Sequence, residues 1–307
     1  MSSKIGGEAD GSVMVPEAMP DLPYWSRTYA SYPERFVHPF TLQLAPNSQL
    51  SFSQAPCVSA EHAREARASA DGSCTASTVW DAGIVLAEHV YNSYIGLQSS
   101  PSQSSTAACR CLDLGSGTGI VGLSAAASGA FGSVVLSDLP SVVPLLRKNA
   151  RENSTAIGPD VSVTSLALVW DDHAALEKAA ELGPYTLILG GDLLYRPQVV
   201  EPLLTALTRL TQESTVVLLA ASLGHSPETL TLFTQRAGEE GFVVECLRET
   251  ALKTFEFSSD EVRMLSLRRR GAQGQAPGIG EGTKQGIRIS ESQEDLSARA
   301  PKRPRGD

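Results

Sequence analysis

The sequence is poor in cysteine, the residue whose disulfide bonds hold small secreted domains together. Only five of the 307 residues are cysteines, an odd number without the regular spacing of a disulfide framework. Cys109 and Cys111 are close enough in sequence to be half of a metal site, but they fall on a predicted core strand. We therefore interpret them as buried reduced thiols and predict no metal site.

Two further absences limit what the chain binds. Acidic residues outnumber basic ones by 34 to 25, and the net charge of −9 gives no general affinity for nucleic acid. The longest apolar run, Val216 to Leu223, is far too short to span a bilayer, and the first apolar residues are too scattered for a secretory signal. We expect a soluble, monomeric, cytoplasmic protein that binds neither nucleic acid nor membranes.

Hydrophobic periodicity is missing from both ends of the chain. Residues 1–35 and 271–307 are rich in small, polar and charged residues, and we predict that both are disordered. The basic run at 302–305 resembles a nuclear-import signal, so the nucleus is an alternative location, although such runs are usually only solvated charge. Between the ends there is room for one large α/β domain, predicted over residues 36–270, with a polar insertion at 59–73.

The most informative stretch is Cys111-Leu-Asp-Leu-Gly-Ser-Gly-Thr-Gly-Ile-Val-Gly122. An apolar run leads into three glycines and then into a helix of small residues, which predicts a strand, a tight turn and a helix start. Glycine permits the dihedral angles of such a turn and lets a ligand approach the backbone. The free N–H groups at the helix start offer donors to a polar ligand. A plain turn usually needs one glycine, so we predict a ligand site here.

The glycines fit two kinds of cofactor site. The spacing Gly-x-Gly-x-x-Gly from Gly117 to Gly122 matches the dinucleotide fingerprint, with Asp138 at roughly the distance expected of a ribose-binding acid. The longer string from Asp113 to Gly119, Asp-x-Gly-x-Gly-x-Gly, instead resembles motif I of the class I S-adenosylmethionine methyltransferases. That cofactor also presents ribose hydroxyls to Asp138. The rest of the chain must decide between the two.

Acidic and aromatic residues follow the predicted strands at their carboxyl ends, where open α/β sheets bind ligands. Asp138 ends one strand, and its alternative role, compatible with the first, is to cap the helix that we predict to begin at Pro140. Trp170 ends the next strand and suits an adenine pocket. Asp192, with Tyr195 after it, follows a strand that is apolar throughout, as in a central parallel position. The alternative for Asp192 is a helix-capping or loop carboxylate.

The pattern of elements predicts the fold. A hairpin with its turn at Asn47-Ser48 is expected within 36–54, and a helix over 78–94 begins near Trp80, either a core tryptophan or a wall of the ligand pocket. Strand–helix units then repeat five times and end in two strands with no room for a helix between them. This order predicts an α/β fold with a seven-stranded, mostly parallel sheet, an antiparallel last strand and helices on both faces. After the glycine turn, strands are expected at 133–138, 161–169, 185–195, 215–222, 242–247 and 262–267, and later helices at 199–210 and 226–240.

Four landmarks occur in order along the chain: Val79-Trp80-Asp81-Ala82, the glycine string 113–119, Ser137-Asp138 and Gly191-Asp192-Leu-Leu-Tyr195. Together they resemble the seven-strand protein-lysine methyltransferases (methyltransferase family 16), small cytosolic enzymes that modify chaperones, AAA ATPases and translation factors. The resemblance covers about residues 38–269. It implies the class I methyltransferase Rossmann-like fold, S-adenosyl-L-methionine as the cofactor and a lysine of a protein as the substrate.

The resemblance also implies a role for each site residue. Asp192 and Tyr195 are the catalytic pair on the substrate side, where Asp192 holds the incoming lysine ammonium and Tyr195 orients the amine once it is neutral. The implied cofactor residues are Trp80 at the methionine side, Asp113, Gly115, Ser116, Gly117 and Gly119 in the loop, Asp138 at the ribose, and Trp170 and Gly191 beside the adenine and the sulfonium.

The sequence departs from the family after the fifth strand. It reads Ala221-Ser222-Leu223 where relatives often carry an arginine, so the choice of substrate is open. Asparagine and DNA-adenine methyltransferases carry two prolines where this chain has Asp-Leu-Leu-Tyr, which argues against amide or base substrates. The remaining alternatives are a small-molecule methyltransferase, a cofactor-binding module without activity and a dinucleotide dehydrogenase.

Overall fold

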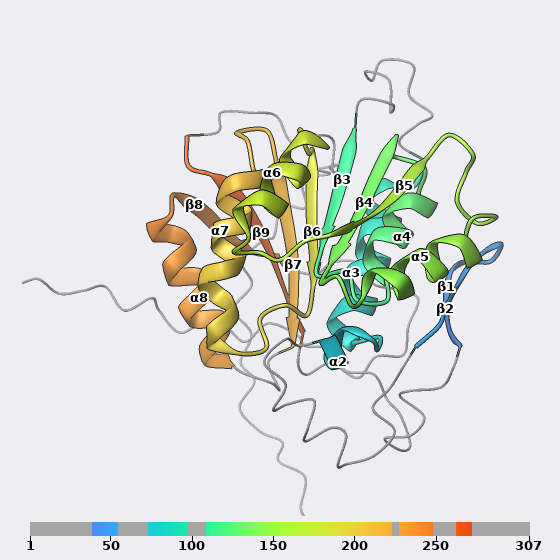
Figure 1. Ribbon diagram of the computed structural model, residues 1–307, viewed down its shortest axis with the longest axis horizontal. Coiled ribbons are helices and arrows are strands. Elements are labelled where there is room, and N and C mark those ends of the chain that lie inside the picture. Colours follow the sequence, from blue (N-terminus) through green and yellow to red (C-terminus); the bar gives the residue numbers. More distant parts are fainter. Residues whose placement is uncertain (1–38, 55–72, 97–108, 223–226, 248–261, 272–307) are drawn as a thin grey trace, which may run out of the picture. The chain divides into compact units, whose positions relative to one another are not determined.

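The computed structural model describes residues 39–54, 73–96, 109–222, 227–247 and 262–271 (Figure 1). All of them belong to one compact unit, residues 1–274. The predicted disordered ends lie outside the described residues, apart from Gly271. The predicted insertion at 59–73, apart from its last residue, and the basic run at 302–305 lie outside them as well.

The described elements alternate between strands and helices after an N-terminal hairpin. The hairpin strands are β1 (Phe40–Ala45) and β2 (Ser48–Phe52). The other strands are β3 (Arg110–Leu114), β4 (Ser133–Asp138), β5 (Ser162–Ala167), β6 (Leu187–Gly191), β7 (Val216–Ser222), β8 (Phe242–Cys246) and β9 (Val262–Arg269). The helices are α2 (Ser73–Ala76), α3 (Asp81–Tyr94), α4 (Ile120–Ala127), α5 (Val143–Glu152), α6 (His173–Glu181), the 3₁₀ turn η4 (Pro197–Val199), α7 (Val200–Leu210) and α8 (Pro227–Glu239).

Seven strands form the main sheet in the order β5-β4-β3-β6-β7-β9-β8. Neighbours from β5 to β7 are parallel, whereas β9 is antiparallel to both β7 and β8. The predicted sheet, mostly parallel with an antiparallel last strand, is therefore confirmed. The chain runs outward from β3 through β4 to β5 and then returns to β6 on the other side, so a topological switch point lies between β3 and β6.

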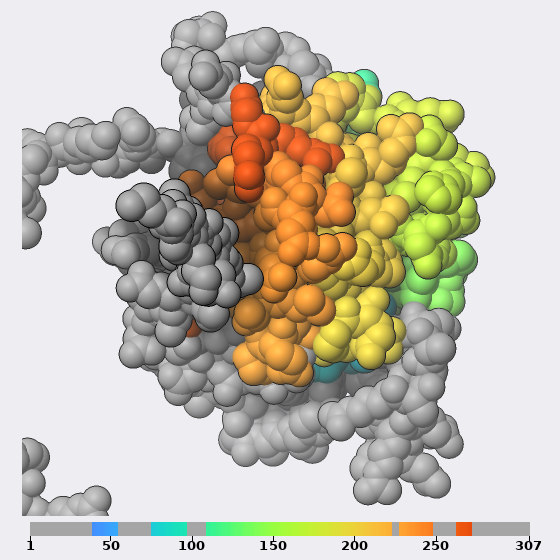
Figure 2. All heavy atoms as spheres, turned by 90° about the vertical axis from the view of Figure 1, so that its left-hand side faces the viewer, coloured from blue at the N-terminus to red at the C-terminus, as the bar shows by residue number. Residues whose placement is uncertain are grey.

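Both faces of the sheet are covered by helices (Figure 1). One buried apolar cluster joins residues of α3, α4 and α5 with the hairpin, and a second joins residues of α6, α7 and α8. In the side view α8 lies next to α7 (Figure 2). The central strands are apolar throughout because burial on both faces leaves no position for a solvated side chain. In the described part of the chain, no helix combines the length and the hydrophobicity needed to cross a membrane.

Several predicted boundaries are wrong, among them the start of one helix, the hairpin turn and the end of one strand. Pro140 lies in a turn, and α5 begins at Val143 with Pro144 in its first turn, where proline's missing N–H has no partner to lose. The hairpin turn is Pro46-Asn47, one residue earlier than predicted. The fourth strand stops at Gly191 instead of continuing to Tyr195, because Asp192 adopts the left-handed conformation with a φ of 60°.

Candidate functional site

A cleft of about 1060 Å³ lies at the carboxyl ends of β3, β4 and β6, at the switch point of the sheet. All of the residues predicted for the site line this cleft except Gly119. Gly119 instead forms the N-cap of α4 with a φ of 86°, and a Cβ there would lie 3.3 Å from Leu123 and Leu146. Its role in the structure is to turn the chain into the helix.

The glycine loop has no space for side chains on its cleft side. Gly115 and Gly117 have φ angles of 58° and 57°, in the region that L-residues rarely adopt. A Cβ on Gly117 would lie 2.8 Å from the backbone oxygen of Ala76, and one on Gly115 would lie 2.7 Å from Leu193 and 3.1 Å from Trp170. The backbone of the loop is thus bare toward the cleft.

Asp113 lies beneath the loop and is fully buried. One carboxyl oxygen, Oδ2, accepts a hydrogen bond of 2.9 Å from the Gly122 N–H of α4. The other, Oδ1, is buried and has no hydrogen-bond partner among the described residues. Burial raises the pKa of this carboxyl to about 7. A buried acceptor without a partner is rare in folded proteins.

Asp138 is anchored to the loop. Its Oδ2 accepts a bond of 2.7 Å from the Gly117 N–H, and its Oδ1 accepts one of 2.7 Å from the Leu139 N–H. The alternative role as a helix cap is wrong, because the N-cap of α5 is Val142 and no side chain bonds there. The side chain is only 6% exposed, and this burial raises its pKa to about 6.

Two tryptophans form walls of the cleft. The Trp80 indole N–H donates to the Thr75 oxygen at 2.7 Å, which fixes the ring at the start of α3. Trp170 packs over Gly115. The sequence-based interpretation missed Gly83, which lets α3 approach β6 so closely that a Cβ on Gly191 would lie 3.0 Å from the Gly83 Cα. A glycine inside a helix lowers the stability of the helix by about 1 kcal/mol relative to alanine. Its presence within the predicted helix was therefore a signal, available from the sequence, that the position has a packing role.

Asp192 joins the ends of two strands on the far side of the cleft. Its Oδ1 accepts a bond of 2.9 Å from the Ser222 N–H, and its own N–H donates to the Ala220 oxygen at 2.7 Å. Tyr195 is partly exposed, and the Arg196 guanidinium carbon lies 5.3 Å from the centre of its ring. Arg196, also missed from the sequence, lines the cleft beside them.

The predicted thiols are free. Cys111 is fully buried and Cys109 partly so, and burial raises the pKa of Cys111. The described residues contain no group of three or more His, Cys, Asp or Glu side chains that is placed to hold a metal ion.

The inserted antiparallel strand and the bare glycine loop at the switch point define a fold of the class I methyltransferase type. Within that class, the chain belongs to the lysine methyltransferase family, whose model matches residues 64–235. Two similar relatives are the protein N-lysine methyltransferases METTL21A of Danio rerio, 32% identical over 148 residues, and of Xenopus tropicalis, 33% identical over 150 residues. A third is the EEF1A lysine methyltransferase 3 of Mus musculus, 28% identical over 156 residues. The aligned parts cover 48–50% of this chain and 60–61% of the relatives.

Proposed function

We propose that the cleft binds S-adenosyl-L-methionine and that the protein transfers the methyl group to a lysine side chain of a protein. The observation that carries the proposal is the glycine loop at the switch point of the sheet, whose Gly117 N–H holds the Asp138 carboxyl beside the cleft. The buried Asp113 carboxyl beneath the loop suits a cationic ligand, because burying a charge requires a partner of opposite sign.

The remaining residues of the cleft fit the same cofactor. Gly115 and Gly117 line the cleft with their backbone, against which the amino-acid end of a ligand can lie. Asp138, held by the Gly117 N–H, is placed to accept hydrogen bonds from ribose hydroxyls. Trp80 and Trp170 offer flat apolar surfaces for the methionine side and the adenine, with Gly191 between α3 and the ligand. When bound, the cofactor supplies an activated methyl group on a sulfonium.

Asp192 and Tyr195 are the proposed catalytic pair. A lysine has a pKa of about 10.4, so its amine enters mostly protonated and must lose a proton before it attacks. The Asp192 carboxylate, fixed by the Ser222 N–H, holds the incoming ammonium, and the Tyr195 hydroxyl orients the neutral amine. Most of the rate then comes from positioning two reactants in line.

The names of the relatives support a protein substrate, since all three describe enzymes that methylate lysine. The absence of prolines between Asp192 and Tyr195 argues against a planar amide or base as the acceptor.

The test is incubation of the protein with radiolabelled S-adenosylmethionine and a whole-cell lysate. We expect a labelled protein band that disappears with Asp192→Asn and persists with Asp160→Asn, a matched change at an exposed turn outside the cleft. Label in a metabolite would instead identify a small-molecule methyltransferase. Cofactor binding without any label transfer would identify a silent binding module.

A further inference from the structure

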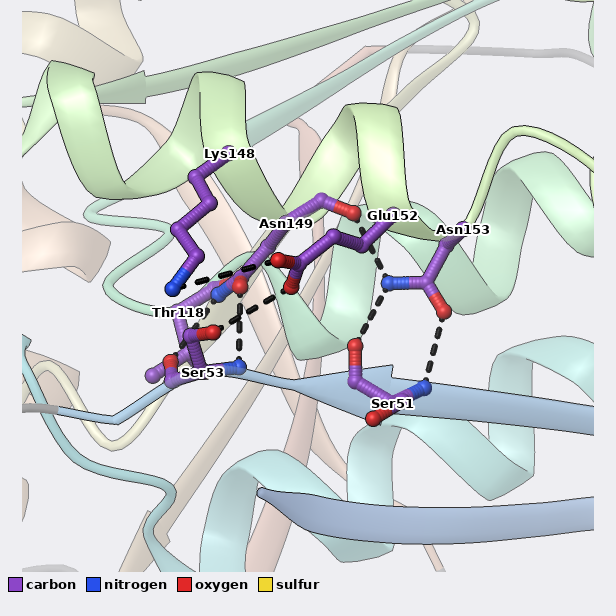
Figure 3. A network of polar contacts seen from close by, with 7 residues as sticks. All are labelled: Ser51, Ser53, Thr118, Lys148, Asn149, Glu152 and Asn153. Carbon is purple, nitrogen blue, oxygen red and sulfur yellow. Dashed lines mark hydrogen bonds and ion pairs between the residues drawn. The ribbon is translucent and has the colours of Figure 1, made fainter. Parts of the chain in front are cut away.

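The N-terminal hairpin forms a sheet of its own, and the free edge of β2 is covered by side chains of α5 (Figure 3). Asn153 accepts a hydrogen bond from the Ser51 N–H at 2.8 Å and donates to the Ser51 oxygen at 2.7 Å. Asn149 makes the same pair with Ser53, at 2.9 Å and 3.1 Å. The two side-chain amides thus make the backbone hydrogen bonds that a neighbouring strand would otherwise make.

The spacing explains why two asparagines suffice. An asparagine amide offers the same donor and acceptor as a peptide group. Alternate residues of a strand are about 6.5 Å apart, and side chains four residues apart on a helix are about 5–6 Å apart. The two residues therefore hold the hairpin through its backbone, in addition to the packing of its buried apolar side chains.

Asn149 makes one contact that Asn153 lacks. Its side-chain N–H also donates to the Thr118 oxygen at 2.8 Å, between the glycines of the loop. The corresponding N–H of Asn153 donates to the Asn149 oxygen within its own helix, also at 2.8 Å. Asn149 is fully buried, so its amide joins the hairpin and the glycine loop in a place that water does not reach.

The next residue of the hairpin contacts a second wall of the cleft. The Gln54 side-chain oxygen accepts a hydrogen bond of 2.7 Å from the Val79 N–H, directly before Trp80. Gln54 and Val79 are both buried. Ser53 is therefore linked to the glycine loop, and the next residue, Gln54, is linked to the turn directly before Trp80.

We propose that Asn149 is a positioning residue through which the docked hairpin holds the glycine loop in its ligand-binding shape. Among the described residues, the hairpin contributes none to the lining of the cleft, so it acts on ligand affinity indirectly, through these hydrogen bonds and through the packing of its apolar side chains on α3 and α4. The proposal rests on the proposed function for the identity of the ligand and on the observed contacts for everything else.

The first test compares Asn149→Ala with Asn153→Ala in the full chain. Each variant removes one of the two side-chain amides that bond to the backbone of the hairpin, and only Asn149→Ala also removes the hydrogen bond to Thr118. We expect both variants to melt at a lower temperature. Well below both midpoints, Asn149→Ala should weaken the calorimetric Kd for S-adenosylhomocysteine by about 5-fold or more, the effect of one lost hydrogen bond, while Asn153→Ala binds like the wild type. Equal effects in the two variants, or none, would overturn the proposal.

A second pair of variants tests the role of the hairpin if Asn149→Ala does not fold. Gln54→Ala removes the tie to Val79 and should also weaken binding. Ser53→Ala is its control, because the hydrogen bond that this side chain makes among the described residues is to Glu152, at 3.2 Å, and the two bonds between Asn149 and the Ser53 backbone stay intact. Wild-type affinity in Gln54→Ala would contradict the role of the hairpin at this wall.

Hydrogen exchange in the ligand-free protein separates this proposal from the proposed function. The Gly117 and Gly119 N–H groups are bonded, to Asp138 and to Ser116, and report on the shape of the loop. Both should exchange faster in Asn149→Ala, or in Gln54→Ala if the first variant does not fold, than in Asn153→Ala. If the wild type fails to bind S-adenosylhomocysteine, the proposed function is wrong, and hydrogen exchange still decides whether Asn149 is a positioning residue. Unchanged exchange would overturn it.

Discussion

Of the carboxyl groups that line the cleft, three accept a hydrogen bond from a backbone N–H of another segment. Asp113 bonds Gly122, Asp138 bonds Gly117, and Asp192 bonds Ser222. Such bonds fix a carboxylate in place. A replacement therefore has to separate the loss of ligand contacts from the loss of the anchor.

Asp138 and Asp192 should differ in what they contribute. We expect Asp138→Ala to weaken binding of S-adenosylhomocysteine by about 1–3 kcal/mol, the usual loss when a charged hydrogen-bond partner is removed. Asp192→Asn keeps an oxygen for the Ser222 N–H and should bind normally, but with most of the turnover lost, as for an interaction made in the transition state. Calorimetry and steady-state kinetics measure the two effects. If Asp192→Asn binds as weakly as Asp138→Ala, Asp192 belongs to the cofactor site.

Affinity for the cofactor should depend on pH through Asp113. Its pKa is raised to about 7, so the ligand-free carboxyl is partly protonated near neutrality, and a cationic ligand requires the ionised form. Binding then releases protons, and affinity should rise from about pH 6 to about pH 7.5. Asp113→Asn should bind more weakly and show a flatter profile. Titrations in buffers of different ionisation enthalpy detect the released protons, and their absence would refute the pairing.

Glu88, in the middle of α3, should make the fold less stable in alkaline solution. Its carboxyl is 2% exposed, has no hydrogen-bond partner among the described residues, and burial raises its pKa from 4.5 to about 8. The folded state favours the protonated form, so this contribution is complete below about pH 4.5 and is lost as the pH rises to about 8.

Glu88→Gln should therefore raise the melting temperature by several degrees at pH 8 and leave it nearly unchanged at pH 4.5. Glu181→Gln, at an exposed position of α6, is the control and should change neither value. A gain of equal size at both pH values would contradict a titrating carboxyl. Thermal melts followed by circular dichroism are sufficient.

At the scale of elements, the glycine loop is the part that tolerates least change. Even alanine at Gly117 would place a Cβ 2.8 Å from the Ala76 oxygen, in a left-handed conformation. We expect Gly117→Ala to displace the loop from α2 and to reduce cofactor affinity at least about 10-fold, with a smaller loss of stability. Gly158→Ala, where a Cβ would meet nothing within 4 Å, is the matched control. Normal binding by Gly117→Ala would contradict the loop geometry.

Most elements could be predicted because their sequences report burial directly. β4 begins and ends where predicted, and α3, α7 and α8 lie within a few residues of the predicted helices. The start of α5 was misplaced because Pro140 and Pro144 are both acceptable in a first helical turn, and only the turn around Leu139 distinguishes them.

The contacts between elements could not be predicted in the same way. Asn149 and Asn153 look like ordinary polar residues of a helix, and their partners, Ser53 directly after β2 and Ser51 in β2, are 96 and 102 residues away. The bond between Asp138 and the Gly117 N–H likewise depends on the path of the loop. The glycine string and the residues at strand ends were accessible from sequence because the sheet brings all carboxyl ends to one edge.

At the scale of the whole chain, we predict that the extensions are dispensable for folding. A chain trimmed to residues 36–270 should melt cooperatively near the midpoint of the full chain and bind the cofactor with similar affinity, because no apolar periodicity links the ends to the core. Loss of soluble expression would show that the boundary is wrong. Normal binding with poor methylation would assign the extensions to substrate docking.

The position of β9 has a consequence for synthesis on the ribosome. β9 is the last of the described strands to be translated, yet it lies between β7 and β8 and bonds to both. Until residues 262–269 emerge, one edge of β7 is unpaired and β8 lacks its neighbouring strand, which is the condition that favours association with other chains. This half of the sheet cannot close during translation, so a nascent chain that stalls before β9 should depend on chaperones more than one that stalls after it.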